Sequence, residues 1–203
     1  MNNSYVNSIR KQVKNVLESD KKRYRHSLSV AHTAACLAYS LGLDDEKAFV
    51  AGLLHDCAKC YSDRELLEIS RNNSLEITPY ELESPYLLHA KVGALHAKQH
   101  FQCDDEDILN AITYHTTGRP NMSPLEEIIF LADYIEPYRD KAANLSEVRA
   151  LAFKDIKEAI YVVTRDTLDY LRSCNKPIDP LTYETFKYYE AETCDKGFTM
   201  EEE

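Results

Sequence analysis

Helix-capping signals recur along this 203-residue chain, and they constrain its fold more than any other feature. Ser62-Asp63-Arg64-Glu65 has the pattern of a capping box, and Ser123-Pro124-Leu125-Glu126 repeats it with proline at the first helical position. Only 5 glycines occur, most of them where helices are expected to stop, and no segment shows sustained strand-like alternation. The sequence therefore predicts an all-α, single-domain helical bundle. The expected helices cover residues 5–19, 24–41, 44–59, 84–100, 104–114, 123–137, 146–174 and 181–190, with another that opens at residue 62.

The size and charge of the chain restrict its class. At 44% hydrophobic residues it can bury one core, and we expect one domain over residues 1–203 with an acidic tail frayed from about residue 195. No apolar stretch reaches the ~18–20 residues that span a bilayer, and the first residues lack the apolar core of a signal peptide. We therefore expect a cytoplasmic protein without membrane contact. A net charge of −10 disfavours long nucleic acid as a partner but leaves small anions open, because a bound cation reverses the local charge.

Six scattered cysteines agree with a reducing compartment. Cys57 and Cys60 have the two-residue gap of a zinc or redox pair, but no second pair accompanies them. Ordinary packing is the favoured interpretation of these thiols. The 14 tyrosines supply packing or interface material and make a homodimer plausible.

His55-Asp56 is the most informative site candidate, because an apolar helical run, Ala48–Leu54, ends in two adjacent side chains that can bind a metal. His26 opens another expected helix, and Asp133 is a carboxylate within an apolar turn that needs a cation or strong donors, such as Arg139. Two imidazoles and two carboxylates without thiolate suit iron, manganese, zinc or nickel. Open coordination positions would admit water and a substrate oxygen, which favours attack on a phosphoryl group.

Three more residues are candidates for the same site. Lys59 follows His55 by four residues and could reach a phosphate from the same helix face, although a solvated lysine is the simpler alternative. His89 and His115 could donate to phosphate, protonate the leaving group, or bind a second metal. For His32, His96 and His100 the spacing favours packing or solvated roles.

Four segments carry a resemblance to the HD-domain phosphohydrolase superfamily, specifically its YqeK-type branch. The segments are Arg25–Ala31, Gly52–Lys59, His115–Gly118 and Leu131–Pro137. They stand in the expected order within a resemblance that covers about residues 10 to 190. The resemblance implies an HD-type helical bundle and symmetrical hydrolysis of diadenosine tetraphosphate to two ADP molecules, with iron at the metal site.

The resemblance also implies roles for individual residues. The metal ligands would be His26, His55, Asp56 and Asp133. The catalytic residues would be Asp56, Lys59, His89 and His115. The nucleotide contacts would be His26, Asp56, Cys57, Ala58, Lys59, His89, His115, Thr116, Asp133, Arg139, Lys176, Pro177, Ile178, Asp179, Pro180 and Leu181. Within the last loop, Asp179 would place a negative charge near the nucleotide.

Three alternatives stay open from the sequence. Another nucleotide phosphohydrolase of the same superfamily would share the ligand set and differ in its products. A metal-dependent nucleotide sensor would bind ADP without turnover. A helical interaction protein with core histidines would leave the His55-Asp56 doublet unexplained.

Overall fold

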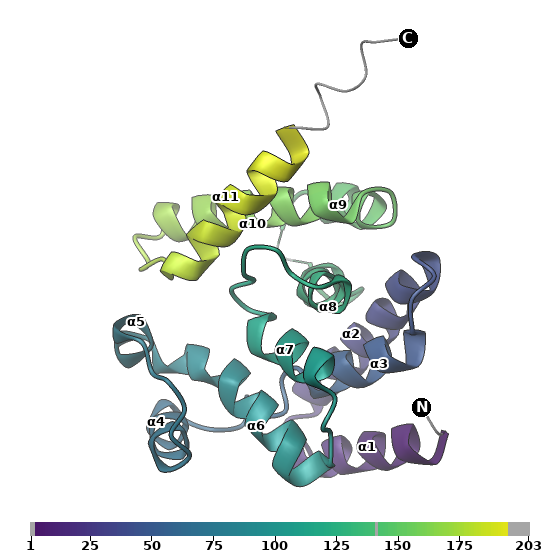
Figure 1. Cartoon of the computed structure of the whole chain (residues 1–203), viewed down its shortest axis with the longest axis vertical. Coiled ribbons are helices and arrows are strands. Elements are labelled where there is room, and N and C mark those ends of the chain that lie inside the picture. Colours follow the sequence, from purple (N-terminus) through teal and green to yellow (C-terminus); the bar gives the residue numbers. More distant parts are fainter. Residues whose placement is uncertain (1–2, 141, 195–203) are drawn as a thin grey trace.

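The computed structural model describes residues 3–140 and 142–194, and helices form all the regular secondary structure in these ranges (Figure 1). The elements are α1 Asn3–Val16, α2 Lys21–Ser40, α3 Asp45–Leu54, α4 Asp63–Asn72, α5 Pro79–Glu83, the 3₁₀ helix η1 Pro85–Leu88, α6 His89–Phe101, α7 Glu106–Tyr114, α8 Pro124–Ile135, α9 Leu145–Ala152, α10 Ile156–Ser173 and α11 Pro180–Cys194. The predicted all-α class is confirmed. No described helix combines the length and apolar composition that crossing a membrane requires.

The capping signals in the sequence form as expected. The Ser62 and Ser123 side chains each accept a hydrogen bond from the third helical backbone N–H, and Glu65 and Glu126 bind back to the cap residue. Asp44 accepts from the backbone N–H of Lys47 and begins α3. These caps satisfy the free N–H groups at three helix starts, so the local sequence fixes where these helices begin.

Several predicted helix boundaries are wrong. The helix expected over residues 146–174 is two helices, because Asp155 caps a new start at α10 by accepting from Glu158 N. The helix expected to end near Lys59 ends at Leu54, and residues 55–60 are turns. The helix expected over residues 84–100 starts as η1, and only from His89 onward is it α-helical. Helix α5 was not predicted, and α11 is longer at both ends than residues 181–190. The expected frayed tail lies outside the described residues.

The crossing of α2 and α3 positions the two parts of the candidate site. Gly52 on α3 lies against the backbone of α2, where an added Cβ would stand 2.8 Å from Ala31 Cα. Because glycine permits this approach, His55 at the end of α3 comes close to His26 on α2, with their ring centroids 5.2 Å apart. Buried aliphatic residues of both helices continue into one core that includes α7 and α8.

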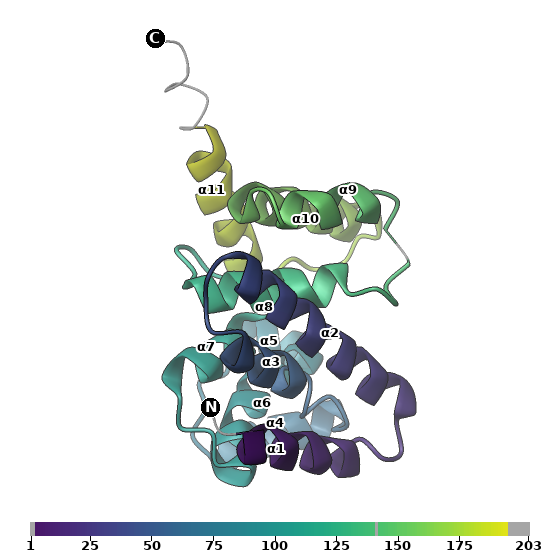
Figure 2. The ribbon, with the colours of Figure 1, turned by 90° about the vertical axis from the view of Figure 1, so that its right-hand side faces the viewer.

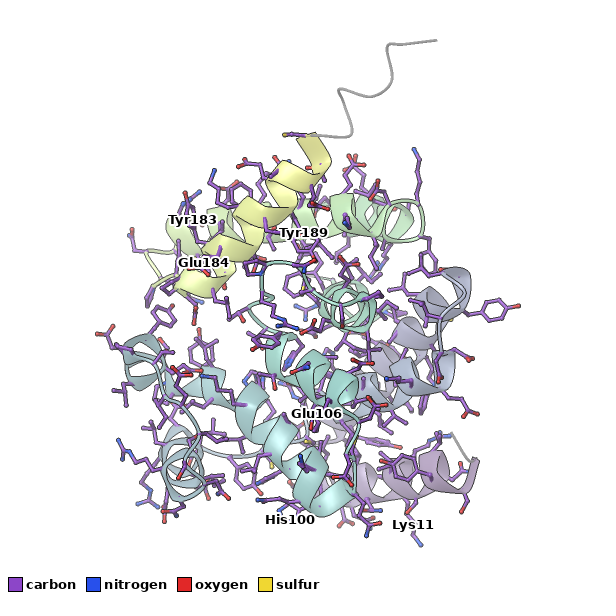
Figure 3. The ribbon with its side chains drawn as sticks, viewed as in Figure 1. Lys11, His100, Glu106, Tyr183, Glu184 and Tyr189 are labelled. Atoms are coloured by element: carbon purple, nitrogen blue, oxygen red, sulfur yellow. The ribbon has the colours of Figure 1, made fainter. Side chains whose placement is uncertain are left out.

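The remaining helices surround this centre. Helices α9, α10 and α11 lie together on the far side of α8 from α2 and α3 (Figures 1 and 2). Tyr183, Glu184 and Tyr189 mark this layer, whereas His100 and Lys11 mark the opposite end of the molecule (Figure 3). The buried hydroxyl of Tyr189 donates to Glu127 on α8 over 2.8 Å and ties α11 to the core.

Candidate metal centre

Three separate segments deliver the four predicted metal ligands. His26 lies in the second turn of α2, His55 and Asp56 follow α3 directly, and Asp133 lies in the last turn of α8. His55 and Asp56 are buried, while the side chain of Asp133 keeps 24% of its exposure. Ligands at helix ends are held by the bundle and still border solvent, which suits a site that admits a substrate.

The ligand atoms of these residues converge on one point. The Nε2 atom of His26 is 3.0 Å from Asp133 Oδ1 and 3.8 Å from Asp56 Oδ2. The Nε2 atom of His55 is 3.5 Å from Asp56 Oδ2 and 3.9 Å from Asp133 Oδ1. The structure therefore brings together all four residues that the sequence selected.

One buried atom shows that this cluster fits a cation. The Nδ1–H group of His55 donates to Gly52 O over 2.7 Å, so Nε2 is the ring nitrogen whose lone pair can bind a metal. This Nε2 atom is buried and has no hydrogen-bond partner. A buried acceptor without a donor is costly, and a cation between it and the two carboxylates removes the cost.

The electrostatics of the cluster agree with cation binding. Burial raises the pKa of Asp56, but the adjacent histidines outweigh it and hold this pKa well below the ordinary value. Burial also opposes ionisation of Asp133, yet His26, His55 and Arg139 keep its pKa low. Both carboxylates are therefore negative at neutral pH and stand ready as metal ligands.

A second set of ligand atoms shares Asp56. Its Oδ1 atom is 3.3 Å from His89 Nε2 and 3.6 Å from His115 Nε2. Both histidines donate Nδ1–H to backbone carbonyls, those of Tyr86 and Ile112, so their lone pairs lie on Nε2. The two Nε2 atoms are only 3.2 Å apart, which requires a proton or a cation between them.

Cationic side chains border the carboxylates. Lys59 Nζ lies 3.0 Å from His89 Nε2, and burial lowers its pKa. The Arg139 guanidinium lies 3.0 Å from Asp133 Oδ1, so the arginine partner considered from the sequence is present together with the histidines. Arg23 Nη1 is 2.5 Å from Asp56 Oδ2.

Arg23 and Glu136 are site residues that the sequence analysis did not select. Glu136 is buried, and its Oε1 atom is 3.3 Å from Nδ1 of His26, an arrangement that orients the ring. Signals existed for both residues. Arg23 belongs to the basic cluster that opens α2, and Glu136 lies between an apolar helix and Pro137.

A cavity of about 380 Å³ opens over the cluster. Its lining combines the candidate ligands with the cationic residues and with the loop after α8. The lining residues are Arg23, His26, Asp56, Lys59, His115, Thr116, Asp133, Glu136, Tyr138, Arg139 and Asp140. Seven of the predicted nucleotide contacts, namely His26, Asp56, Lys59, His115, Thr116, Asp133 and Arg139, therefore face one cavity.

Other predicted contacts lie elsewhere. The thiol of Cys57 is buried against Gly93 O, and Ala58 packs in an apolar cluster with Leu88, so neither side chain faces the cavity. The predicted loop from Lys176 to Leu181 is a loop only as far as Asp179, because Pro180 and Leu181 open α11. Asp179 and Leu181 line a small cavity of about 100 Å³ that Thr116 also borders. Lys176 lies apart, with its Nζ over the ring of Tyr170.

The remaining histidines have packing contacts, as the sequence favoured. His32 packs edge-on against Phe49. His96 packs between Tyr61 and His100 near the end of α6. All six cysteines are free thiols; Cys57 is buried and Cys60 is exposed.

Comparisons with known proteins give the class of this fold and site. The HD domain model matches residues 23–138, more than half of the chain. A crystal structure from Clostridium acetobutylicum of a "predicted HD superfamily hydrolase involved in NAD metabolism" matches with a TM-score of 0.86 and 39% identity, covering 90% of this chain and 97% of that one. The chain belongs to the HD domain family.

Several curated relatives of this chain share one name within this family. Proteins named "Bis(5'-nucleosyl)-tetraphosphatase, symmetrical" from Halalkalibacterium halodurans and Bacillus subtilis are 42% and 39% identical over 166 residues. These matches cover 81% and 82% of this chain and 87% and 88% of the relatives. The protein of the same name from Staphylococcus aureus is 37% identical over 172 residues.

Proposed function

We propose that this protein hydrolyses diadenosine tetraphosphate and related dinucleoside tetraphosphates symmetrically, releasing two nucleoside diphosphates. The observation that carries the proposal is the buried, unpartnered Nε2 of His55 facing Asp56 and Asp133. The relatives named as symmetrical tetraphosphatases cover more than four-fifths of the chain, which favours this substrate over others of the superfamily.

The first proposed role is metal binding. His26, His55, Asp56 and Asp133 would hold a divalent cation, and we propose iron, with manganese, nickel and zinc as alternatives, because all four ligands are nitrogen or oxygen. Such a cation supplies a hydroxide nucleophile at neutral pH and offsets charge that develops on phosphoryl oxygens. Glu136 would keep the ring of His26 oriented toward it.

The side chains around the cluster would bind and orient the phosphates. Lys59, Arg139 and Arg23 line the cavity and bring positive charge to a bridge of four phosphates. Their charge also explains how an anionic substrate approaches a chain of net charge −10. The hydroxyl of Thr116, 3.1 Å from His115 Nε2, would donate to a phosphate oxygen.

His89 and His115 would act on the phosphates as well. If a proton lies between their Nε2 atoms, the pair can donate it to the departing nucleoside diphosphate. If a second cation binds there, Asp56, His89 and His115 would hold it and it would offset charge on the phosphoryl oxygens. Metal analysis separates the two arrangements, since the first requires one metal per chain and the second requires two.

One nucleoside would extend from Thr116 toward the loop from Lys176 to Leu181. Asp179 and Leu181 border the small cavity beside Thr116, so these two residues would contact the base or ribose. Pro177, Ile178, Pro180 and Lys176 would shape the loop. Cys57 and Ala58 would contribute backbone atoms, because their side chains are buried away from the cavity.

Three further properties belong to this proposal. Residues 1–203 would act as one domain, because α9, α10 and α11 pack on the core beyond the residues that the family model matches. Six free thiols support a cytoplasmic location. A homodimer is proposed on the exposed tyrosines, among them Tyr170 and Tyr183 of α10 and α11.

The test combines metal analysis with product analysis on freshly purified protein. We expect diadenosine tetraphosphate to give ADP alone, and in ¹⁸O-water one of the two ADP molecules should carry the label. ATP with AMP, or nucleoside with phosphate, would instead indicate a different phosphohydrolase. Binding of ADP without turnover under iron, manganese or nickel would indicate a sensor.

A further inference from the structure

A second cavity of about 640 Å³ lies beside the metal centre. Its lining residues come from α2, from the end of α8 and the loop after it, and from α9 and the residue that follows α9. Figure 2 shows α2 and α9 on either side of α8. Cavities of roughly 300–1,000 Å³ are the usual size of small-molecule sites. Neither the predicted metal ligands nor the predicted nucleotide contacts line this cavity.

The walls of this cavity suit a flat, apolar ring. Tyr138 and Phe153 line it and expose 59% and 50% of their surface, although large aromatic side chains usually bury more. The only charged residues in its wall are Arg25 and Arg149. The Arg149 guanidinium already donates to the backbone carbonyls of Ile135, Glu136 and Arg139, so it shapes the wall.

The cavity shares part of its lining with the cavity over the metal centre. Tyr138 lines both cavities, and Arg25 precedes the metal-ligand candidate His26 in the sequence. The guanidinium of Arg25 lies 4.6 Å from the centre of the Tyr138 ring. From His26 to His32, which also lines the cavity, α2 rises about 9 Å, so the cavity leads away from the metal centre along this helix.

The cavity over the metal centre shares Thr116 with the small cavity of Asp179 and Leu181, and it shares Tyr138 with the larger cavity. These two neighbouring cavities are the candidate exits for the two ends of the substrate. Symmetrical cleavage places the middle of the tetraphosphate at the metal, so a nucleoside must extend in each direction. The first exit serves the nucleoside already assigned to the loop after α10, and the second nucleoside needs the other exit.

We propose that the cavity between α2 and α9 binds the second nucleoside of the substrate, with its base against Tyr138 and Phe153. This assignment rests on the proposed function. Arg25 lines this cavity beside Tyr138, the residue shared with the cavity over the metal centre, and there it can pair with the phosphate next to that nucleoside. The two halves of a symmetrical substrate thus meet different surroundings. The small cavity is lined by the carboxylates of Glu81 and Asp179 and by Lys91, whereas the larger cavity is aromatic and cationic.

The test compares a substrate with two nucleosides and a substrate with one. Diadenosine tetraphosphate occupies both exits, whereas adenosine 5′-tetraphosphate needs only one. Phe153→Ala removes an aromatic wall, and Cys36→Trp places an indole in the cavity from an exposed position on α2. Tyr39→Ala is the matched control, because Tyr39 is 79% exposed on α2 and lies outside the cavity lining.

Both cavity variants should raise KM for diadenosine tetraphosphate about tenfold, since stacking of a base on an aromatic side chain is worth ~1–3 kcal/mol. KM for adenosine 5′-tetraphosphate should change less than about twofold, and Tyr39→Ala should change neither value. A methylene-bridged, uncleavable dinucleoside analogue should likewise bind the wild type more tightly than it binds either cavity variant.

Other outcomes overturn the assignment. Equal changes in KM for both substrates, or no change for either in both variants, would place the second nucleoside elsewhere. A change of oligomeric state in Cys36→Trp, seen by size-exclusion chromatography, would make this face a contact between copies of the chain. If the wild type cleaves diadenosine tetraphosphate but the variants give one of these contrary results, only the assignment of the second nucleoside fails. If the wild type does not cleave diadenosine tetraphosphate, the proposed function and this assignment both fail.

Discussion

The two ring nitrogens of His55 show how single residues prepare this site. Nδ1–H donates to Gly52 O one helical turn earlier, and this bond fixes the tautomer. Nε2 then faces Asp56 and Asp133 with its lone pair free. A histidine at the end of an apolar helix is thereby oriented as a candidate ligand in place of a core side chain.

Removing one ligand should remove the metal. We expect Asp133→Asn to lower metal content to below about a tenth of the wild-type value and to abolish hydrolysis, because the amide keeps the shape and loses the charge. His55→Ala should do the same. Metal analysis of purified protein and the rate of ADP release provide the measurements.

The matched control for this prediction is Asp169→Asn, whose carboxylate is exposed on α10. It should retain metal and activity. Full activity of Asp133→Asn after metal depletion would remove Asp133 from the ligand set. Circular dichroism should show unchanged helix content in all variants, because the ligands lie at helix ends.

Lys59 should affect the nucleotide more than the metal. Its half-buried ammonium faces the cavity beside His89 and carries no ligand atom of the cluster. We expect Lys59→Met to raise the Kd for ADP about tenfold, which is about 1.4 kcal/mol, with metal content unchanged. Calorimetric titration of ADP and of metal measures the two effects separately.

Lys98→Met is the control for this measurement, because Lys98 is exposed and pairs with Glu106 at the end of α6. Loss of metal in Lys59→Met alongside loss of ADP binding would make Lys59 part of the metal centre. An unchanged Kd for ADP would return Lys59 to the solvated role that the sequence also allowed.

Residue patterns predict the ligands better than the residues around them. His55-Asp56 and Asp133 are conspicuous because metal-binding side chains follow or interrupt apolar segments. The sequence signals of Arg23 and Glu136 are weaker, since a basic cluster and a helix-end glutamate usually lie in solvent. Their roles come from the distances that the fold sets, 2.5 Å to Asp56 and 3.3 Å to His26.

At the scale of the element, capping signals define helix starts more reliably than helix ends. Ser62, Ser123 and Asp44 mark starts that the structure has, because each satisfies free N–H groups locally. The break at Phe153–Asp155 carries a cap at Asp155, but the helical periodicity continues across it. The end of α3 at Leu54 depends on tertiary packing around His55, which periodicity cannot show.

Gly52 should set both stability and metal binding, because it controls the approach of α3 to α2. An alanine Cβ there would stand 2.8 Å from Ala31 Cα and force the helices apart. We expect Gly52→Ala to lower the free energy of unfolding by about 1–3 kcal/mol and to weaken metal binding. Urea unfolding and metal titration test the two effects.

Gly42→Ala provides the contrast for Gly52→Ala. Gly42 has a φ of +69° in open space, so its replacement strains the backbone without any steric overlap. It should lower stability by about 1 kcal/mol and leave metal affinity unchanged. Equal loss of metal affinity in both variants would show that stability alone, rather than the helix approach, controls the site.

At the scale of the whole molecule, the sequence predicts the class of fold but does not predict the cavities. The helix-capping signals predict an all-α fold, and the four motif segments predict membership of the HD family. The comparisons confirm the family. The cavity beside the metal centre joins Cys36, Tyr138 and Phe153 from three separate segments. No spacing rule relates such residues, so only their packing reveals that they face one another.

A metal bound by the four proposed ligands should also stabilise the whole fold, since these residues join α2, the end of α3 and α8. A ligand that binds only the folded state at 100 times its Kd adds about 2.7 kcal/mol. For a chain of this length, 1 kcal/mol shifts Tm by roughly 2–4 °C, so chelation should lower Tm by roughly 5–10 °C. Adding back manganese or iron should restore Tm in the wild type, whereas Asp133→Asn should show the low Tm with or without metal. An equal response to chelator in both proteins would mean that the stabilising metal binds away from Asp133.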